Sequence, residues 1–150
     1  MGPRAPRPDD PGAQAENGAR RPVIAVFNSS NDTVELLRIV LEEEGFQTVV
    51  GHIPDLKKGE LDLVSFIRHH APTVIVYDIS PPYDANWTFL RLVRSSEAAQ
   101  GRRFVITTTN KPALDKLVGP TDALEIIGKP YDLRQVVMAV RSALAQPDSA

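Results

Sequence analysis

The stretch that decides the fold of this chain is residues 73–82, which read TVIVYDISPP. Its apolar, β-branched run has no polar alternation, and this is typical of a strand that is buried on both faces of a sheet. Pro81 and Pro82 cannot donate the hydrogen bonds of a strand ladder, so the strand must end before them. Open α/β sheets place their ligand crevice at the carboxyl edge of such strands, and we expect Asp78 to lie there.

Segments of strand character alternate with segments of helical periodicity on both sides of this stretch. Further strands are predicted at residues 23–27, 46–50, 103–109 and 123–127, and helices at 32–45, 62–70, 86–96, 112–118 and 132–144. Asp32 is expected to cap the first of these helices. Such alternation predicts right-handed crossovers and a parallel sheet with helices on both faces. The predicted fold class is therefore α/β, a flavodoxin-like, doubly wound, five-stranded sheet in the order 2-1-3-4-5.

Composition limits the function classes that need to be considered. The chain has 150 residues, a net charge of −2 and no cysteine, which excludes thiol chemistry and gives no general attraction to nucleic acid or membrane. Neither a secretory signal nor a membrane-spanning apolar stretch is present, so a cytoplasmic location is expected. Residues 1–22 are rich in proline and glycine and are predicted to be a disordered tail. The folded domain is predicted at 23–146, with a disordered end at 147–150.

The predicted strand order brings polar residues from several strand ends into one pocket. Strands one, three and five would meet at Asn28, Asp78 and Lys129, with Thr108 at the end of strand four. Glycine-rich phosphate loops and a G-x-S-x-G elbow are absent from the sequence. A carboxylate, a hydroxyl and an ammonium group suit phosphoryl transfer onto the carboxylate. Two plainer interpretations stay open: Asp78 and Lys129 could form an ion pair that ties two strands together, and the threonines could simply favour a strand.

These motifs, in this order, resemble the receiver domain of bacterial two-component response regulators, and the resemblance covers Pro22 to Leu144. It implies that Asp78 is the phosphoacceptor and that Thr108 is the switch hydroxyl. It also implies that Lys129 and Pro130 are the paired lysine and proline whose peptide bond is cis. The expected rim of the pocket consists of Ser80, Thr109 and Asn110.

The chain also departs from the receiver pattern, so an atypical member is expected. Asn28 and Ser29 stand where receivers carry acids that hold Mg²⁺, so a metal site formed by Asp78, Asn28 and Ser29 is expected to be weak. Ile126 occupies the aromatic switch position and cannot make a tyrosine hydrogen bond. Thr109 replaces a small residue beside the switch threonine.

The resemblance implies a stand-alone response-regulator module of a phosphorelay, not an enzyme beyond self-catalysed phosphoryl transfer. A histidine kinase or phosphotransfer protein would donate the phosphoryl group to Asp78. The signal would pass to a downstream protein through helix 112–118, strand 123–127 and the last helix, with no DNA and no membrane as partner, and with a homodimer left open. The alternative is a pseudo-receiver that is never phosphorylated and acts as an adaptor or dimerisation module. A hydrolytic enzyme is the weakest hypothesis, because Asp78 has no second acid or histidine at a strand end.

Overall fold

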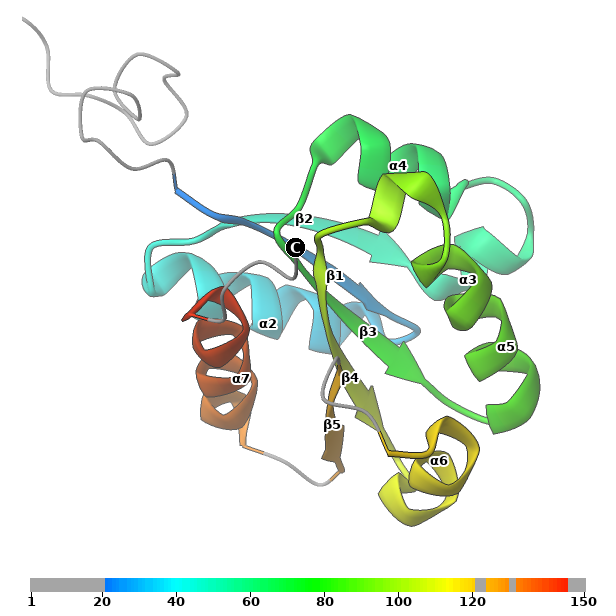
Figure 1. Ribbon diagram of the computed structural model, residues 1–150. Coiled ribbons are helices and arrows are strands. Elements are labelled where there is room, and N and C mark those ends of the chain that lie inside the picture. The colour runs from blue at the N-terminus through cyan, green and yellow to red at the C-terminus, as the bar shows by residue number, and fades with distance from the viewer. Residues whose placement is uncertain (1–20, 121–123, 130–131, 146–150) are drawn as a thin grey trace, which may run out of the picture.

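A computed structural model describes residues 21–120, 124–129 and 132–145, and it shows one parallel sheet covered by helices on both faces (Figure 1). The strands are β1 (Val23–Asn28), β2 (Gln47–His52), β3 (Val74–Ile79), β4 (Arg103–Thr108) and β5 (Leu124–Gly128). Their order in the sheet is β2-β1-β3-β4-β5. The predicted fold class and strand order are confirmed.

The helices are α2 (Asn31–Glu43), α3 (Ile53–Lys57), α4 (Leu63–His70), α5 (Tyr83–Arg94), α6 (Lys111–Val118) and α7 (Leu133–Ala145), with a short 3-10 turn η1 (Glu97–Ala99). Helices α3 and η1 were not predicted, because neither is long enough to show a helical period. The cap of α2 is Ser30 and not the predicted Asp32, since the Ser30 side chain accepts a hydrogen bond from the Thr33 amide.

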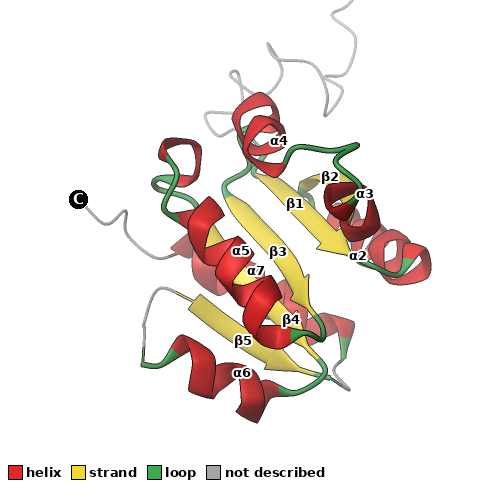
Figure 2. Cartoon of the chain, turned by 90° about the vertical axis from the view of Figure 1, so that its right-hand side faces the viewer, coloured by secondary structure: helices red, strands yellow, loops and turns green. Residues whose placement is uncertain are grey.

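Two apolar clusters, one on each face of the sheet, hold these layers together. Helices α3, α4, α5 and α6 pack on the face that carries Ile75 and Tyr77, whereas α2 and α7 pack on the face that carries Val74 and Val76. Figure 2 shows α5 lying across the near face of the sheet. All six residues of β3 are buried, as the sequence predicted, because successive side chains point to opposite faces and both faces are covered. The site at the end of β3 is therefore built on the most enclosed strand.

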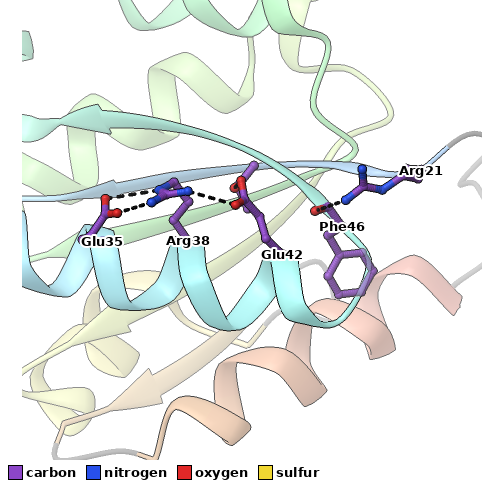
Figure 3. A network of polar contacts seen from close by, with 6 residues as sticks. Arg21, Glu35, Arg38, Glu42 and Phe46 are labelled. Atoms are coloured by element: carbon purple, nitrogen blue, oxygen red, sulfur yellow. Dashed lines mark hydrogen bonds and ion pairs between the residues drawn. The ribbon is translucent and has the colours of Figure 1, made fainter. Parts of the chain in front are cut away.

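The first described residues are tied to the turn after α2. The Arg21 guanidinium donates hydrogen bonds to the backbone oxygens of Gly45 (2.8 Å) and Phe46 (3.0 Å). On α2 itself, Arg38 pairs with both Glu35 and Glu42, one turn away on either side (Figure 3). These contacts occupy the side of α2 that faces β2, since Glu42 also accepts a hydrogen bond from Thr48.

Gly51 in β2 is a position where the core allows no side chain. A Cβ atom there would overlap the ring of Phe27, whose Cδ1 lies 2.8 Å from the ideal Cβ position. That ring is fixed in turn by contacts with Phe66 and Tyr77, whose ring centres lie 4.9 Å and 5.8 Å away.

We expect Gly51→Ala to lower the free energy of unfolding by about 1–3 kcal/mol, because the overlap forces a packed aromatic ring to move. The measurement is chemical denaturation. In a Phe27→Leu background the cost of Gly51→Ala should be clearly smaller, because the clashing atoms are gone. An equal cost in both backgrounds would contradict this account of the packing.

Candidate functional site

The candidate site is centred on the carboxylate of Asp78, which is 4% exposed at the carboxyl end of β3. Its Oδ1 atom lies 3.0 Å from the Lys129 Nζ atom and accepts a hydrogen bond of 2.7 Å from the Thr107 hydroxyl. A buried carboxylate is costly unless it is paired and hydrogen-bonded, and here both conditions are met. Lys129 is 29% exposed, so the pair is open to solvent on the lysine side.

The register of the sheet positions these three groups. Asp78 is paired with Thr107 between β3 and β4, so both side chains point to the same face, the one covered by α2 and α7. Lys129 follows the last residue of β5, and its amide donates a 2.7 Å hydrogen bond to the Thr108 carbonyl oxygen. This bond holds the lysine backbone against β4, and the long side chain reaches across β4 to Asp78.

The structure brings Thr107, and not the predicted Thr108, into contact with Asp78. Thr108 is paired with Ile79, so its side chain points to the opposite face of the sheet from Asp78. Its hydroxyl instead accepts a long hydrogen bond, 3.4 Å, from the Asn110 amide. In a run of three threonines, composition cannot indicate which hydroxyl faces Asp78, because strands alternate with a period of two and the register is a tertiary property.

The end of β1 reaches the same edge of the sheet, as predicted, but its side chains serve the start of α2. Phe27 is paired with Tyr77, and continuing that register by one residue puts Asn28 beside Asp78. Asn28 is buried, and its Oδ1 atom accepts a hydrogen bond of 3.0 Å from the Ser30 amide. Ser29 is exposed. The amide oxygen that was expected to help a metal is thus already used in a turn.

The donor set does not fit a resident Mg²⁺ ion. Mg²⁺ requires a near-octahedral shell of oxygen ligands, drawn mostly from carboxylates and water. Across residues 21–120, 124–129 and 132–145, no group of three or more acidic, histidine or cysteine side chains could hold a metal. Asp78 supplies one carboxylate, and its Oδ1 is already paired with a cation. Asp84, the acid next in the chain, is exposed and binds the Ala85 amide.

The predicted rim residues mainly organise the loops around the site. The Ser80 carbonyl accepts a 2.6 Å hydrogen bond from the Asn86 side chain, and Asn110 caps α6 by accepting from the Ala113 amide. The Thr109 hydroxyl lies 2.7 Å from the Tyr83 hydroxyl, which joins the loop after β3 to the loop after β4. This contact links the start of α5, after β3, to the segment after β4.

Of the two predicted switch positions, Ile126 lies within the described residues and Pro130 does not. Ile126, at the predicted aromatic switch position, is half-buried and packs against the apolar cluster beneath α5 and α6. It therefore makes an apolar contact and no tyrosine-type hydrogen bond. Pro130 lies outside the described residues, and with it the predicted Lys129–Pro130 cis bond. Within the described chain a cis bond joins Pro81 to Pro82.

Comparison with known proteins bears on the fold of the chain. No family model matches the chain. The response regulator Rre1 of Synechocystis sp. is 25% identical over 117 residues, which are 77% of this chain and 48% of that protein. The chain thus spans about half the length of the curated relative it matches.

Solved structures are matched over nearly their whole length. The chemotaxis protein CheY4 of Vibrio cholerae superposes with a TM-score of 0.63 at 16% identity, over 82% of this chain and 98% of that one. A two-component response regulator of Clostridium difficile superposes with a TM-score of 0.63 at 17% identity, over 86% and 100%. The CheY-like receiver domain of Methylobacillus flagellatus gives 0.61 at 13%, over 82% and 98%.

This chain has a receiver fold. Its Asp78, Thr107 and Lys129 lie at the ends of β3, β4 and β5 of that fold. No helix among the described residues of the receiver fold is long and apolar enough to cross a membrane.

Burial of Tyr77, the neighbour of Asp78 in the receiver fold, raises the pKa of its hydroxyl well above the usual value, and the Asp78 charge adds to the shift. In the unfolded chain the hydroxyl loses its proton near pH 10. Because the folded pKa is the higher one, stability from this group is fully present below pH 10 and is lost as the pH rises above it.

We expect Tyr77→Phe to reduce the loss of stability between about pH 9.5 and 11.5, because this variant has no hydroxyl to ionise on unfolding. Urea denaturation across this range is the measurement, and Tyr83→Phe, at a half-buried tyrosine, is the control. Parallel losses in wild type and Tyr77→Phe would contradict the assignment.

We also expect Thr107→Val to cost about 1–3 kcal/mol of unfolding free energy, since it removes a hydrogen bond to a buried carboxylate. Thr108→Val is the matched control on the next residue. It removes only a long, weak hydrogen bond and should cost less than about 1 kcal/mol. The reverse order of the two costs would restore Thr108 as the partner of Asp78.

Proposed function

We propose that this chain is a receiver-type signalling module that accepts a phosphoryl group on Asp78 and signals by protein–protein contact in the cytoplasm. The observation that carries the proposal is the contact of one buried carboxylate with Lys129 and Thr107 at the carboxyl edge of β3. The likeness to a response regulator and to receiver structures supports it. The donor would be a phosphohistidine of a histidine kinase or phosphotransfer protein.

The proposed reaction is a transfer between two proteins. An Asp78 oxygen attacks the phosphorus of the phosphohistidine, an O–P bond forms, the N–P bond breaks, and the imidazole leaves with a proton from water. Within the described residues both side-chain contacts of the carboxylate fall on Oδ1, so Oδ2 is the proposed attacking atom. Lys129 and Thr107 would then turn to the phosphoryl oxygens, where negative charge gathers.

The proposed switching event is that Lys129 and Thr107 leave the Asp78 carboxylate when it becomes phosphorylated. Lys129 is held by its amide to the Thr108 carbonyl, so a shift of its side chain would be felt at the β4–β5 edge. The proposed output surface therefore consists of α6, β5 and α7, which border this edge. A downstream protein would read that surface.

A second candidate function is a pseudo-receiver that acts as an adaptor without phosphorylation. The specific observation in its favour is the donor set at the end of β1, where Asn28 and Ser29 bring no carboxylate to the site. In this case the Asp78–Lys129 pair would be a permanent tie between β3 and β5. Neither candidate assigns the chain an enzymatic turnover of its own.

The two candidates differ in one measurement, intact mass after incubation with a small phosphodonor such as phosphoramidate and Mg²⁺. The first predicts a mass gain of one phosphoryl group in wild type and in Asp84→Asn, and none in Asp78→Asn. No gain under conditions that label an ordinary receiver would refute it.

A gain-of-function variant sharpens the comparison. Asn28→Asp with Ser29→Asp adds two carboxylates beside Asp78, so labelling should become faster and more dependent on Mg²⁺. Labelling only in this double variant would favour the pseudo-receiver for the natural sequence. Equal rates in wild type and the double variant would show that phosphorylation does not need acids at these positions.

A further inference from the structure

The hydrogen-bond ladder between β3 and β4 ends one residue beyond Asp78, and a side-chain contact lies just past that end. The last register pair of the ladder is Ile79 with Thr108. Beyond it, the Tyr83 hydroxyl lies 2.7 Å from the Thr109 hydroxyl, so the first residue of α5 is joined to the first residue after β4. The segments that follow the two strands are therefore connected once more outside the sheet, at the edge that carries Asp78.

Both hydroxyl groups of this contact belong to side chains with limited freedom of movement. The Tyr83 ring is half-buried and packs against the apolar cluster on this face of the sheet. Thr109 is β-branched and has few rotamers. A contact between two restricted side chains loses little conformational entropy when it forms. Among the described residues, Tyr83 is the one hydrogen-bond partner of the Thr109 side chain, so the position of Thr109 depends on this contact.

Two side-chain hydrogen bonds thus join the same two short segments of the chain. The first runs from the Thr107 hydroxyl to the Asp78 Oδ1 atom, and the second joins Tyr83 to Thr109. The chain itself connects Asp78 to Tyr83 on one side and Thr107 to Thr109 on the other. Bonds within one small network support each other, because each holds the partners of the other close together. A change at Asp78 therefore changes the strength of the contact at Tyr83.

The segment that contains Thr109 leads directly into α6. Thr109 and Asn110 alone separate the last residue of β4 from the first residue of α6. Asn110 is the N-cap of α6: its side-chain oxygen accepts a 3.1 Å hydrogen bond from the Ala113 amide, and its carbonyl oxygen accepts one of 3.1 Å from the Leu114 amide. With so short a connection, a displacement of Thr109 must displace this cap. Figure 2 shows α6 beside α5, from which Tyr83 reaches Thr109.

We infer that Tyr83 is a positioning residue whose hydroxyl carries changes at Asp78 to the start of α6. The contact with Thr109 is closed while Thr107 binds the free carboxylate, and it weakens when Thr107 leaves. The start of α6 then loses its tie to α5. This inference rests on the proposed function for the event that moves Thr107, and it deepens that function by naming the route from Asp78 to the proposed output surface.

The alternative is a surface hydrogen bond that has no connection with the site. The net contribution of such a bond is small, because water can replace either partner. It would also be the same in every state of Asp78. The quantity that separates the two descriptions is therefore how far the contribution of the Tyr83 hydroxyl depends on Asp78.

The test is amide hydrogen exchange at Ala113 and Leu114, measured by NMR without a phosphodonor in wild type, Tyr83→Phe, Asp78→Asn and the double variant. Tyr83→Phe keeps the packed ring and removes the hydroxyl, so both amides should exchange about three to ten times faster, the size expected for one hydrogen bond. Asp78→Asn should accelerate the same amides in the otherwise wild-type chain. In the Tyr83→Phe background it should change them less than about twofold, because the route is already broken.

Three further variants serve as controls. Thr109→Val should reproduce the effect of Tyr83→Phe, whereas Thr109→Ser keeps the hydroxyl and should exchange as wild type does. Ser95→Ala removes an exposed hydroxyl that donates a 2.8 Å hydrogen bond to the Leu92 carbonyl at the other end of α5, and it should leave the exchange at α6 unchanged. Unchanged exchange in Tyr83→Phe would overturn the inference. So would equal acceleration by Asp78→Asn with and without the Tyr83 hydroxyl.

A second arm uses phosphoramidate and Mg²⁺, with intact mass to measure labelling. Labelled wild type should exchange the Ala113 and Leu114 amides at least about three times faster than unlabelled protein, and labelled Tyr83→Phe should show no further change. Equal responses in the two labelled proteins would overturn the inference and leave the proposed function standing. Absence of labelling in wild type would refute the proposed function, and the comparison with Asp78→Asn would then decide the inference by itself.

Discussion

Burial of β3 on both faces is the constraint on which the rest of the structure depends. A strand in this position can present its side chains only to apolar neighbours, and Val74, Ile75, Val76 and Tyr77 do so with helices on each side. Asp78 is the exception, and it is tolerated only because Lys129 and Thr107 reach it. The most enclosed strand therefore ends in a buried carboxylate, and its hydrogen-bond and ion-pair partners must come from the ends of β4 and β5.

The same constraint explains why the edge of the sheet divides its polar groups between two tasks. Thr107 and Lys129 serve the carboxylate, whereas Asn28 and Ser30 serve the start of α2 by accepting hydrogen bonds from backbone amides. A receiver with acids at the end of β1 would use that end for a metal. Here Asn28 and Ser30 accept hydrogen bonds from backbone amides at the start of α2, and the Asp78 carboxylate remains at the centre of the site. Phosphorylation of Asp78 and a purely structural ion pair are therefore both physically reasonable.

The two sides of α2 carry different kinds of side chain. One side carries a closed network of Glu35, Arg38 and Glu42, and these charges need no partner outside the chain. The other side carries exposed apolar residues and an acid that no described residue neutralises.

The sequence by itself determined the fold class, the strand order and the identity of Asp78 and Lys129 as neighbours. These follow from hydrophobic periodicity and from the topology of right-handed crossovers, which depend on local pattern. Only the tertiary structure decided that Thr107 and not Thr108 faces Asp78, because the choice depends on strand register, which a run of three threonines does not encode. It also decided that Ser30 and not Asp32 begins α2, and that Asn28 is used in that turn. In each case several residues of suitable chemistry stood close together in the sequence, and the folded backbone brought one of them to its partner.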